Sequence, residues 1–392
     1  MDRSPAPPRV TETLVIGAGI AGAGCACELA ADGPVILLER ESQPGYHTTG
    51  RSAALYTRSY GNAPMRALTR ASLDFFLAPP AGFSSTPLLS PRGALLVART
   101  DQQDALAALA ADLGVASEAK AGSPLRWLDG GQARALVPCF DPGQLAAALH
   151  DVDASDIDVH ALHHGYLRRM RAAGGELVAD AEVTALEREP DRWRVCTRAG
   201  DFLARVVVDA AGAWADEVAV MAGAAPVGLV PKRRTAITFD PPGGLAVSGW
   251  PAVIDVDEQW YFKPEAGRLL ASPADETPSP PCDAQPDEYD IAVLVDRLSR
   301  ATTLVVPRIH ARWAGLRSFA ADKTLVCGFD PVVPGFFWLA AQGGYGIQTA
   351  PAASMLAAAL IAGRAVPQEL EREGVVAEDF APARCGGLRA KE

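Results

Sequence analysis

The sequence has little of what marks a nucleic-acid-binding or membrane protein. Its 392 residues hold 36 Lys and Arg against 47 Asp and Glu, a formal net charge of -11. Phosphate binding needs clustered cations, so this balance argues against nucleic acid as a partner. A long stretch without any charged residue, 331–363, is divided by prolines, glycines and glutamines into pieces too short to cross a bilayer. We therefore expect no integral membrane segment.

Cysteine is too sparse and too scattered for a disulfide framework. Of the seven cysteines, Cys25 and Cys27 lie two apart on an expected helix, where they point to different faces. Residues 1–10 are polar and proline-rich and lack the apolar core of a signal peptide. These absences predict reduced thiols in a cytoplasmic protein, whose length suggests about two domains.

Histidine is also rare, and its densest cluster is better explained without a metal ion. Three of the six histidines share one helical face, at spacings i, i+3 and i+4. The segment has the pattern of an amphipathic helix that begins after an N-cap aspartate, Asp158. We therefore expect no metal site among Asp156, Asp158, His160, His163 and His164.

What is present near the N-terminus is a strand, a glycine turn, a helix, a second strand and an acid. The apolar runs 13–16 and 35–38 flank the glycine turn and an alanine-rich helix that extends to about Ala31. Gly17 permits the tight turn, Gly19 lets the backbone approach a pyrophosphate, and Gly22 lets the helix pack closely on the strand. The helix N-terminus faces the phosphates. Glu39 can accept hydrogen bonds from ribose hydroxyls and disfavours the 2′-phosphate of NADP.

The residues after Glu39 favour FAD over NAD. An NAD domain would continue into a helix, whereas residues 40–56 form a loop rich in small and hydroxyl side chains, suited to lie along a flavin diphosphate. Two later segments, 206–214 and 336–348, have the pattern of strands of the same sheet that end in small-residue turns. In the second, Gly343–Gly346 would let the backbone pass a flat ring and aim helix amides at the flavin.

Several longer sequence segments resemble those of a known family. They lie at residues 44–61, 79–92, 231–234, 313–319 and 342–349, in collinear order over nearly the whole chain. On these residues the chain resembles the FAD-dependent D-amino-acid oxidase superfamily, and within it looks most like the bacterial D-arginine dehydrogenases.

The resemblance implies an α/β fold with two interleaved domains. A Rossmann-like FAD-binding domain would comprise residues 1–85, 150–228 and 313–392. A substrate-binding domain on a mainly antiparallel β-sheet with helices would comprise 86–149 and 229–312. The sequence agrees, since 235–239, 252–256 and 259–263 are strand-like, 291–299 has helical apolar spacing, and 275–290 is a proline-rich acidic loop.

The resemblance also implies which residues bind the substrate. Arg234, Tyr261 and Arg317 fall on the family's substrate positions, Tyr60 on a loop tyrosine that closes over the substrate, and Gly344 beside the flavin. An amino-acid carboxylate in a dry pocket needs charge-assisted donors, which the planar guanidinium supplies. The alternative for each arginine is a structural salt bridge, and for Tyr60 it is core packing. The expected FAD-binding residues are Gly17, Gly19, Ala21, Gly22, Glu39, Arg40, Thr48, Thr49, Gly50, Arg51, Ser52, Ala53, Ala54, Leu55, Val183, Ala211, Gly212, Gly343, Gly344, Tyr345, Gly346, Ile347 and Gln348.

The implied reaction is hydride transfer from the substrate α-carbon to FAD, which gives an imino acid that hydrolyses to a 2-oxo acid and ammonia. Orientation and electrostatics would supply most of the catalysis. The chain departs from the D-arginine dehydrogenases at Ala94, where they carry a glutamate that pairs with the substrate guanidinium, and at Leu55, where they carry a histidine. We therefore predict neutral or apolar D-amino acids as substrates, because an unpaired guanidinium would be costly to bury. The candidate pocket walls are Leu55, Ala94, Trp250, Ile254 and Tyr261.

Two other functions remain open from the sequence. One is a glycine or sarcosine type of secondary-amine oxidase, which the same two arginines and Tyr261 would serve. The other is a flavin-binding electron-transfer subunit without turnover of its own. The electron acceptor is oxygen or a quinone. Cys327 does not match the flavin attachment site of the sarcosine oxidases, so we expect non-covalent FAD.

Overall fold

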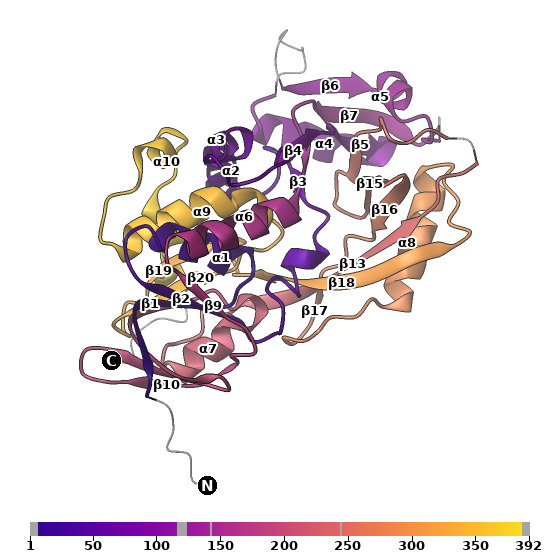
Figure 1. Ribbon diagram of the computed structural model, residues 1–392. Coiled ribbons are helices and arrows are strands. Elements are labelled where there is room, and N and C mark those ends of the chain that lie inside the picture. Colours follow the sequence, from indigo (N-terminus) through magenta and orange to yellow (C-terminus); the bar gives the residue numbers. More distant parts are fainter. Residues whose placement is uncertain (1–6, 116–123, 142, 244, 386–392) are drawn as a thin grey trace.

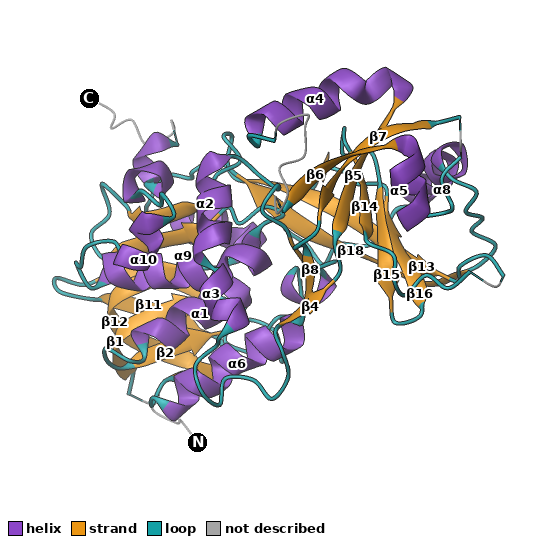
Figure 2. Ribbon diagram, turned by 90° about the horizontal axis from the view of Figure 1, so that it is seen from above, coloured by secondary structure: helices purple, strands orange, loops and turns teal. Residues whose placement is uncertain are grey.

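A computed structural model describes residues 7–115, 124–141, 143–243 and 245–385, and most of the polar start of the chain, residues 1–6, lies outside these ranges. Two large sheets, each covered by helices, form two neighbouring lobes (Figures 1 and 2). We call them the first sheet and the second sheet. A small three-stranded sheet also occurs, made of β3 (Leu55–Tyr56), β4 (Leu89–Pro91) and β8 (Ser155–Ile157).

The first sheet has a parallel core in the order β9–β2–β1–β12–β20. The long strand β12 organises it, because β1 and β20 pair with it in parallel while the β10–β11 hairpin extends it antiparallel. The expected strands at 13–16, 35–38, 206–209 and 336–340 are confirmed. The strands are β1 (Arg9–Ile16), β2 (Val35–Leu38), β9 (Glu176–Val178), β10 (Val183–Arg188), β11 (Trp193–Thr197), β12 (Gly200–Asp209), β19 (Val326–Phe329) and β20 (Phe336–Ala340).

Helices cover one face of the first sheet, and they pack there because strand side chains alternate between faces. Val15, Leu37 and Val208 point toward α1, α6 and α9, whereas Leu14, Ile36 and Val207 point to the opposite face, beside α7. Asp158 caps α6 as expected, since its carboxylate accepts the Ala161 N–H at 2.8 Å. The helices of this lobe are α1 (Ile20–Leu29), α2 (Ala63–Ala71), α3 (Leu73–Leu77), α6 (Val159–Ala172), α7 (Ala215–Met221), α9 (Gly346–Ile361) and α10 (Gln368–Arg372).

The second sheet is antiparallel except for the β5–β14 pair, in the order β17–β13–β16–β15–β14–β5–β7–β6 with β18 beside β13. Its strands include the three expected at 235–239, 252–256 and 259–263, and α8 contains the expected helix at 291–299. The elements are β5 (Ala94–Arg99), β6 (Leu125–Asp129), β7 (Leu145–Asp151), β13 (Val230–Phe239), β14 (Ala252–Asp255), β15 (Tyr261–Glu265), β16 (Arg268–Ser272), β17 (Thr277–Pro278) and β18 (Ile309–Phe319), with α4 (Gln103–Asp112), α5 (Gly130–Leu136) and α8 (Glu288–Ala301).

The chain passes between the two sheets several times, so the lobes are interleaved as expected. No helix in the described ranges has the length and apolar character needed to span a bilayer. The strands β13 and β18 pair over ten positions and reach from the second sheet toward the carboxyl ends of β1, β12 and β20. That meeting place is where a ligand binds in an open α/β sheet.

Candidate active site

A long cavity runs between the carboxyl ends of the first sheet and the β13–β18 pair. It encloses roughly 1630 Å³ of empty space, the solvent-open part included. Most of the residues predicted to bind cofactor or substrate line it. These are Gly17, Gly19, Ala21, Glu39, Arg40, Thr48, Thr49, Arg51, Ser52, Ala53, Val183, Ala211, Gly212, Arg234, Tyr261, Arg317, Gly343, Gly344, Gly346 and Ile347.

The turn between β1 and α1 is closed by backbone contacts that leave no room for side chains. Gly17 has φ +98°, and a Cβ there would lie 2.6 Å from the Ala210 carbonyl oxygen. A Cβ at Gly22 would overlap the Gly17 carbonyl oxygen. Both positions therefore need glycine, and the N-terminus of α1 is left facing the cavity.

Two side chains from later in the sequence complete this turn. Glu39, directly after β2, is buried and accepts the N–H of Ala18 at 2.9 Å, and the Thr49 hydroxyl accepts the N–H of Ile20 at 3.0 Å. Burial raises the pKa of Glu39, although its backbone hydrogen bonds act in the opposite direction. The carboxylate thus lies at the edge of the cavity where the ribose of an adenosine group would bind.

The adenosine end of the cavity, near Glu39, also contains residues that the sequence analysis did not single out. The Trp214 ring lies under the guanidinium of Arg40 at 4.8 Å and beside the His47 ring, also at 4.8 Å. Met221, on α7, lines the same end. Trp214 is the last residue of the strand-and-turn segment 206–214, whereas no local pattern distinguishes Met221 from an ordinary helix residue.

The glycine loop after β20, like the Gly17 turn, has neighbours that leave no room for side chains. A Cβ at Gly343, which has φ +53°, would lie 2.5 Å from the Phe319 ring. At Gly344 a Cβ would lie 2.5 Å from the Tyr60 hydroxyl and 3.0 Å from Arg317. Ala341, directly before the loop, has φ +62°, a conformation that costs a non-glycine residue roughly 1 kcal/mol or more.

These two glycine-lined ends fit FAD. One end offers a helix N-terminus and a buried carboxylate for a diphosphate and a ribose, and the other offers bare backbone for a planar ring. The residues between them, such as Thr48 and Ser52, supply small polar side chains along one continuous cavity. The cavity connects the two ends, as a dinucleotide with a flavin requires.

Two arginines meet at the flavin end because of the β13–β18 register. Arg234 pairs with Gly315, and Arg317 pairs with Lys232, so the two arginines lie diagonally across the strand pair. Gly315 has no side chain, which leaves space opposite Arg234. Diagonal neighbours in a sheet lie within reach of long side chains, so both guanidiniums can converge on one anion.

The surroundings of the two guanidiniums differ. Arg234 is 8% exposed and donates to the Asp275 carbonyl at 2.8 Å and to Glu276 at 3.3 Å. Burial lowers the pKa of Arg234, and the charge of Arg317 lowers it further. Over the described ranges no carboxylate lies within 4 Å of the Arg317 guanidinium. Glu276 is the carboxylate paired with Arg234, and the charges of Asp275 and Glu258 reach Arg317 from longer range. With no described carboxylate paired to Arg317, the two close cations form a site for an anion.

Tyr60 covers the Arg317 side of this site. Its hydroxyl accepts from Arg317 at 3.3 Å, and its ring lies 4.6 Å from that of Tyr345. Burial raises the pKa of Tyr60, while Arg317 acts in the opposite direction, so the phenol stays protonated at neutral pH. Tyr60 therefore combines ring packing with a polar contact to Arg317.

A buried aspartate holds the segment that carries Tyr60. The Thr57 hydroxyl donates to Asp151 at 2.8 Å, and Ser59 lies 2.8 Å from the same hydroxyl. Since Thr57 has given its proton to Asp151, Ser59 is the donor in the second bond. Gln348 of α9 accepts the Thr57 N–H at 3.2 Å. These bonds tie the segment to the second sheet and to α9.

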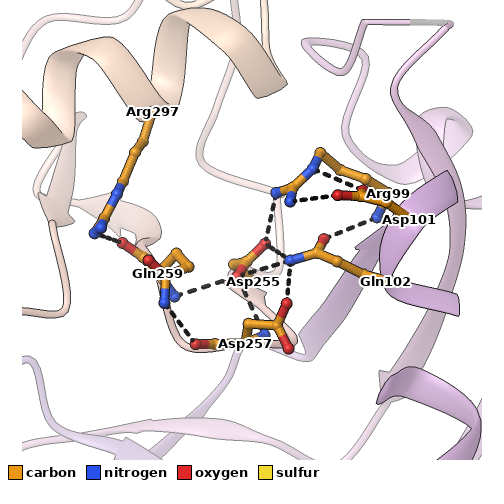
Figure 3. Close-up of polar contacts among 7 residues, drawn as sticks. All are labelled: Arg99, Asp101, Gln102, Asp255, Asp257, Gln259 and Arg297. Carbon is orange, nitrogen blue, oxygen red and sulfur yellow. Dashed lines mark hydrogen bonds and ion pairs between the residues drawn. The ribbon is translucent and has the colours of Figure 1, made fainter. Parts of the chain in front are cut away.

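A second buried aspartate organises the turn before Tyr261 (Figure 3). Asp255 is 1% exposed and accepts from the side chain of Gln102 at 3.1 Å. It also accepts the N–H groups of Asp257 at 3.1 Å and Gln259 at 3.2 Å, which closes the β14–β15 turn. Tyr261 follows as the first residue of β15 and lines the cavity.

Six of the residues predicted to bind FAD lie beside the cavity lining rather than in it. Gly22 packs α1 against the Gly17 turn, and Gly50 donates its N–H to the Gly45 carbonyl at 2.9 Å. Gln348 bridges Thr57 and Thr69 inside the protein. The six are Gly22, Gly50, Ala54, Leu55, Tyr345 and Gln348.

Most of the expected pocket walls also lie behind the lining. Leu55 and Ile254 pack with Ala94 in one small apolar cluster. Trp250 lies elsewhere, in the core of the second sheet, where its ring contacts Phe262. The expectation that Trp250 faces the substrate is therefore not met. Of the five candidate walls, Tyr261 is the one in the cavity lining.

The histidine cluster and Cys327 lie outside the cavity lining. His163 is buried and contacts the Ala18 carbonyl at 2.9 Å, and burial lowers its pKa. The rings of His160 and His164 lie 4.1 Å apart and are tilted by 38°. In the part of the chain that the structure describes, no group of three potential ligands is arranged around a metal ion. Cys327 is fully buried within β19.

Comparison with known proteins identifies relatives of this fold. The model of the FAD dependent oxidoreductase family matches residues 12–360. Glycine oxidase from Geobacillus kaustophilus is 25% identical over 249 residues, covering 61% of this chain and 62% of the relative. A 4-methylaminobutanoate oxidase (formaldehyde-forming) from Paenarthrobacter nicotinovorans is 28% identical over 285 residues, covering 69% of this chain and 34% of the relative. The matched regions span less than two thirds of both relatives.

Solved structures agree on the fold. The glycine oxidase from G. kaustophilus superposes with a TM-score of 0.79 at 21% identity, covering 94% of this chain and 99% of the other. The L-proline dehydrogenase from P. horikoshii superposes with a TM-score of 0.81 at 21% identity, covering 96% and 98%. Resemblance to D-arginine dehydrogenases in particular does not emerge from these matches.

Proposed function

Because the chain belongs to the FAD-dependent oxidoreductase family, we propose that it oxidises the carbon–nitrogen bond of a small amino acid bound by its carboxylate. Neutral D-amino acids are the first candidate substrates. The observation that carries the proposal is the pair Arg234 and Arg317, two cations converging in a partly buried site that requires an anion. The proposal keeps the assignment of residues 1–85, 150–228 and 313–392 to the FAD domain and of 86–149 and 229–312 to the substrate domain.

In this reaction the bound FAD supplies the hydride acceptor. Arg234 and Arg317 hold the carboxylate, which fixes the α-carbon relative to the glycine loop. Tyr261 adds a neutral hydroxyl to the anion site, and Tyr60 closes above it and excludes water. The Gly344 carbonyl accepts from the substrate amine. No side chain is assigned as an obligatory base.

Behind the lining, Leu55, Ala94 and Ile254 form an apolar cluster that contains no carboxylate, which supports a neutral side chain on the substrate. A guanidinium directed toward this cluster would lose its hydration without gaining a partner. The expected order is therefore D-leucine or D-methionine over D-arginine.

A second candidate is a glycine or N-alkyl amino acid oxidase. It is favoured by the names of the sequence relatives, one of which acts on glycine and another on a methylamino acid. The two arginines would serve these substrates equally, because their carboxylate is the same group.

Anaerobic mixing of the FAD-loaded protein with single substrates tests the proposal. Loss of the flavin absorbance with neutral D-amino acids but not L-isomers supports the first candidate, and loss with glycine or sarcosine alone selects the second. Absence of bleaching by all of them would leave a flavin-binding electron-transfer subunit. Reoxidation of the bleached protein by air or by a quinone then identifies the acceptor.

A further inference from the structure

The connection between β17 and α8 crosses the outside of the cofactor cavity. We call residues 279–287 the strap. Its first residue is fixed to β13, since the Ser279 N–H donates to the Pro231 carbonyl at 2.9 Å. Its last residue is fixed to the same strand, since Asp287 lies 3.4 Å from Arg233. Both ends therefore belong to the second sheet, while the middle is free to make contacts elsewhere.

The middle of the strap docks on the loop predicted to lie along the FAD diphosphate. Asp283 accepts from Arg51 at 2.5 Å and from the Tyr46 hydroxyl at 3.5 Å. The Ala284 carbonyl accepts from Arg51 at 3.1 Å. The Ala284 side chain is 4% exposed and packs against Ala213 and its neighbours. A short segment thus combines an ion pair, two further hydrogen bonds and a buried methyl group.

The residues that receive the strap are themselves walls of the cavity. Arg51, Tyr46 and Ala213 all line it, so each contacts the strap on one side and faces the cofactor space on the other. The Arg51 guanidinium is also stacked on the Tyr46 ring at 5.2 Å, which makes the two side chains one unit. A change in the strap is therefore transmitted directly to the wall against which FAD would lie.

We propose that Asp283 is a positioning residue for the cofactor, which retains FAD by holding Arg51 and Tyr46 in the cavity wall. The inference rests on the FAD chemistry of the family and not on the identity of the amino-acid substrate. An ion pair with one partner at 16% and the other at 46% side-chain exposure is worth a modest, salt-sensitive amount. Its effect should be measurable as a rate of FAD loss rather than as loss of fold.

The test compares FAD release from three holoprotein variants after dilution, followed by the rise in flavin fluorescence. Asp283→Asn removes the charge and should accelerate release between about 1.5- and fivefold. Ala284→Asp disrupts the buried docking and should accelerate it about tenfold or more. The matched control is Glu288→Gln, which breaks the exposed ion pair between Glu288 and Arg312 just beyond the strap, away from the cavity lining. It should release FAD at the wild-type rate.

The salt dependence of FAD release distinguishes an electrostatic role of Asp283 from a purely structural one. In the wild type, 0.5 M NaCl should raise the release rate by a larger factor than in Asp283→Asn, because the variant keeps only the salt dependence of the FAD diphosphate itself. Equal acceleration in the Glu288→Gln control, or wild-type release with wild-type salt dependence in Asp283→Asn, would overturn the proposal. If Ala284→Asp does not fold, the Asp283→Asn and salt measurements decide. None of these measurements uses an amino-acid substrate. They therefore test the role of Asp283 even if the proposed reaction is wrong.

Discussion

The cofactor end of the cavity is lined mainly by backbone, whereas the substrate end is lined mainly by side chains. Around the Gly17 turn the wall is mostly backbone, and its shape depends on the absence of side chains. Around Arg234 and Arg317 the wall is made of long side chains from β13 and β18, two strands that meet only in the folded protein. A short stretch of sequence specifies the first end, whereas the second end depends on the pairing of β13 with β18.

This difference predicts how each end fails. A substitution at the cofactor end adds atoms where there is no room and should disturb folding and FAD binding together. A substitution at the substrate end removes donors from an otherwise intact wall and should reduce turnover while FAD remains bound. Substitutions at each end test this difference.

The largest effect is expected at Gly22. Gly22→Ala would place a Cβ into the Gly17 carbonyl and should destabilise the fold by at least about 3 kcal/mol and abolish FAD binding. Gly33→Ala is the control, because it lies in the same βαβ unit with nothing within 4 Å of the new Cβ. It should change stability by about 1 kcal/mol or less. Thermal unfolding and flavin content measure both, and an FAD-loaded Gly22→Ala protein of normal stability would contradict the backbone account.

At the substrate end, Arg317→Met should lower kcat/KM about 100- to 1000-fold with FAD content unchanged, because it removes charge-assisted bonds to the carboxylate. Arg300→Met is the control, since Arg300 is 77% exposed and pairs with Asp296 on the outside of α8. It should have wild-type kinetics. Retention of activity in Arg317→Met would remove the anion site from the reaction.

Tyr261→Phe should lower kcat/KM about tenfold, because it removes one neutral hydrogen bond and keeps the ring. The exposed Tyr289, changed to phenylalanine, is the matched control. A steady-state comparison of the two variants decides. If Tyr261→Phe behaves like the control, the hydroxyl does not contact the substrate.

The smallest effect concerns a side chain buried at the cofactor end. Asp209, at the end of β12, accepts the Ala211 N–H through one oxygen, and its other oxygen has no partner among the described residues. Burial raises its pKa, so the folded state keeps a proton that the unfolded state loses above about pH 4. Wild-type stability therefore falls as pH rises from 4 through the folded pKa.

Asp209→Asn does not titrate and should gain about 1 kcal/mol over the wild type at pH 8, with a smaller gain at pH 5. Urea unfolding at the two pH values measures this. A gain that is the same at both, or a loss at pH 8, would show that the carboxyl is not protonated in the fold.

The cofactor end was predictable from the sequence because its signals are local. The glycine spacing, the two flanking strands and Glu39 lie within about 30 residues, and Asp158 marked the start of its helix at short range. The interleaved fold followed from the resemblance, and the second sheet from short strand patterns.

The other parts of the site depend on tertiary contacts that no local sequence pattern predicts. Trp250 was expected at the substrate but lies in a core, because the face on which a loop residue packs is decided by the sheet beneath it. The proline-rich segment 275–290 was expected to be a loop, but Thr277–Pro278 forms β17 and Glu288 begins α8. The docking of the connection between them on Arg51 required the fold. Asp151 and Asp255, which hold the segments bearing two site tyrosines, carry no sequence signal beyond being acidic.

The pairing of β1 with β12 also has a consequence for synthesis on the ribosome. Ile16 pairs with Asp209, and β20 joins β12 only when residues near 338 have emerged. At ordinary elongation rates β1 can pair with β2 early but waits about 10 to 40 seconds for β12. During that interval the apolar helix α1 is exposed without α9, its later neighbour. The nascent chain therefore needs protection from aggregation, and FAD cannot be accommodated until the last quarter of the protein has been translated.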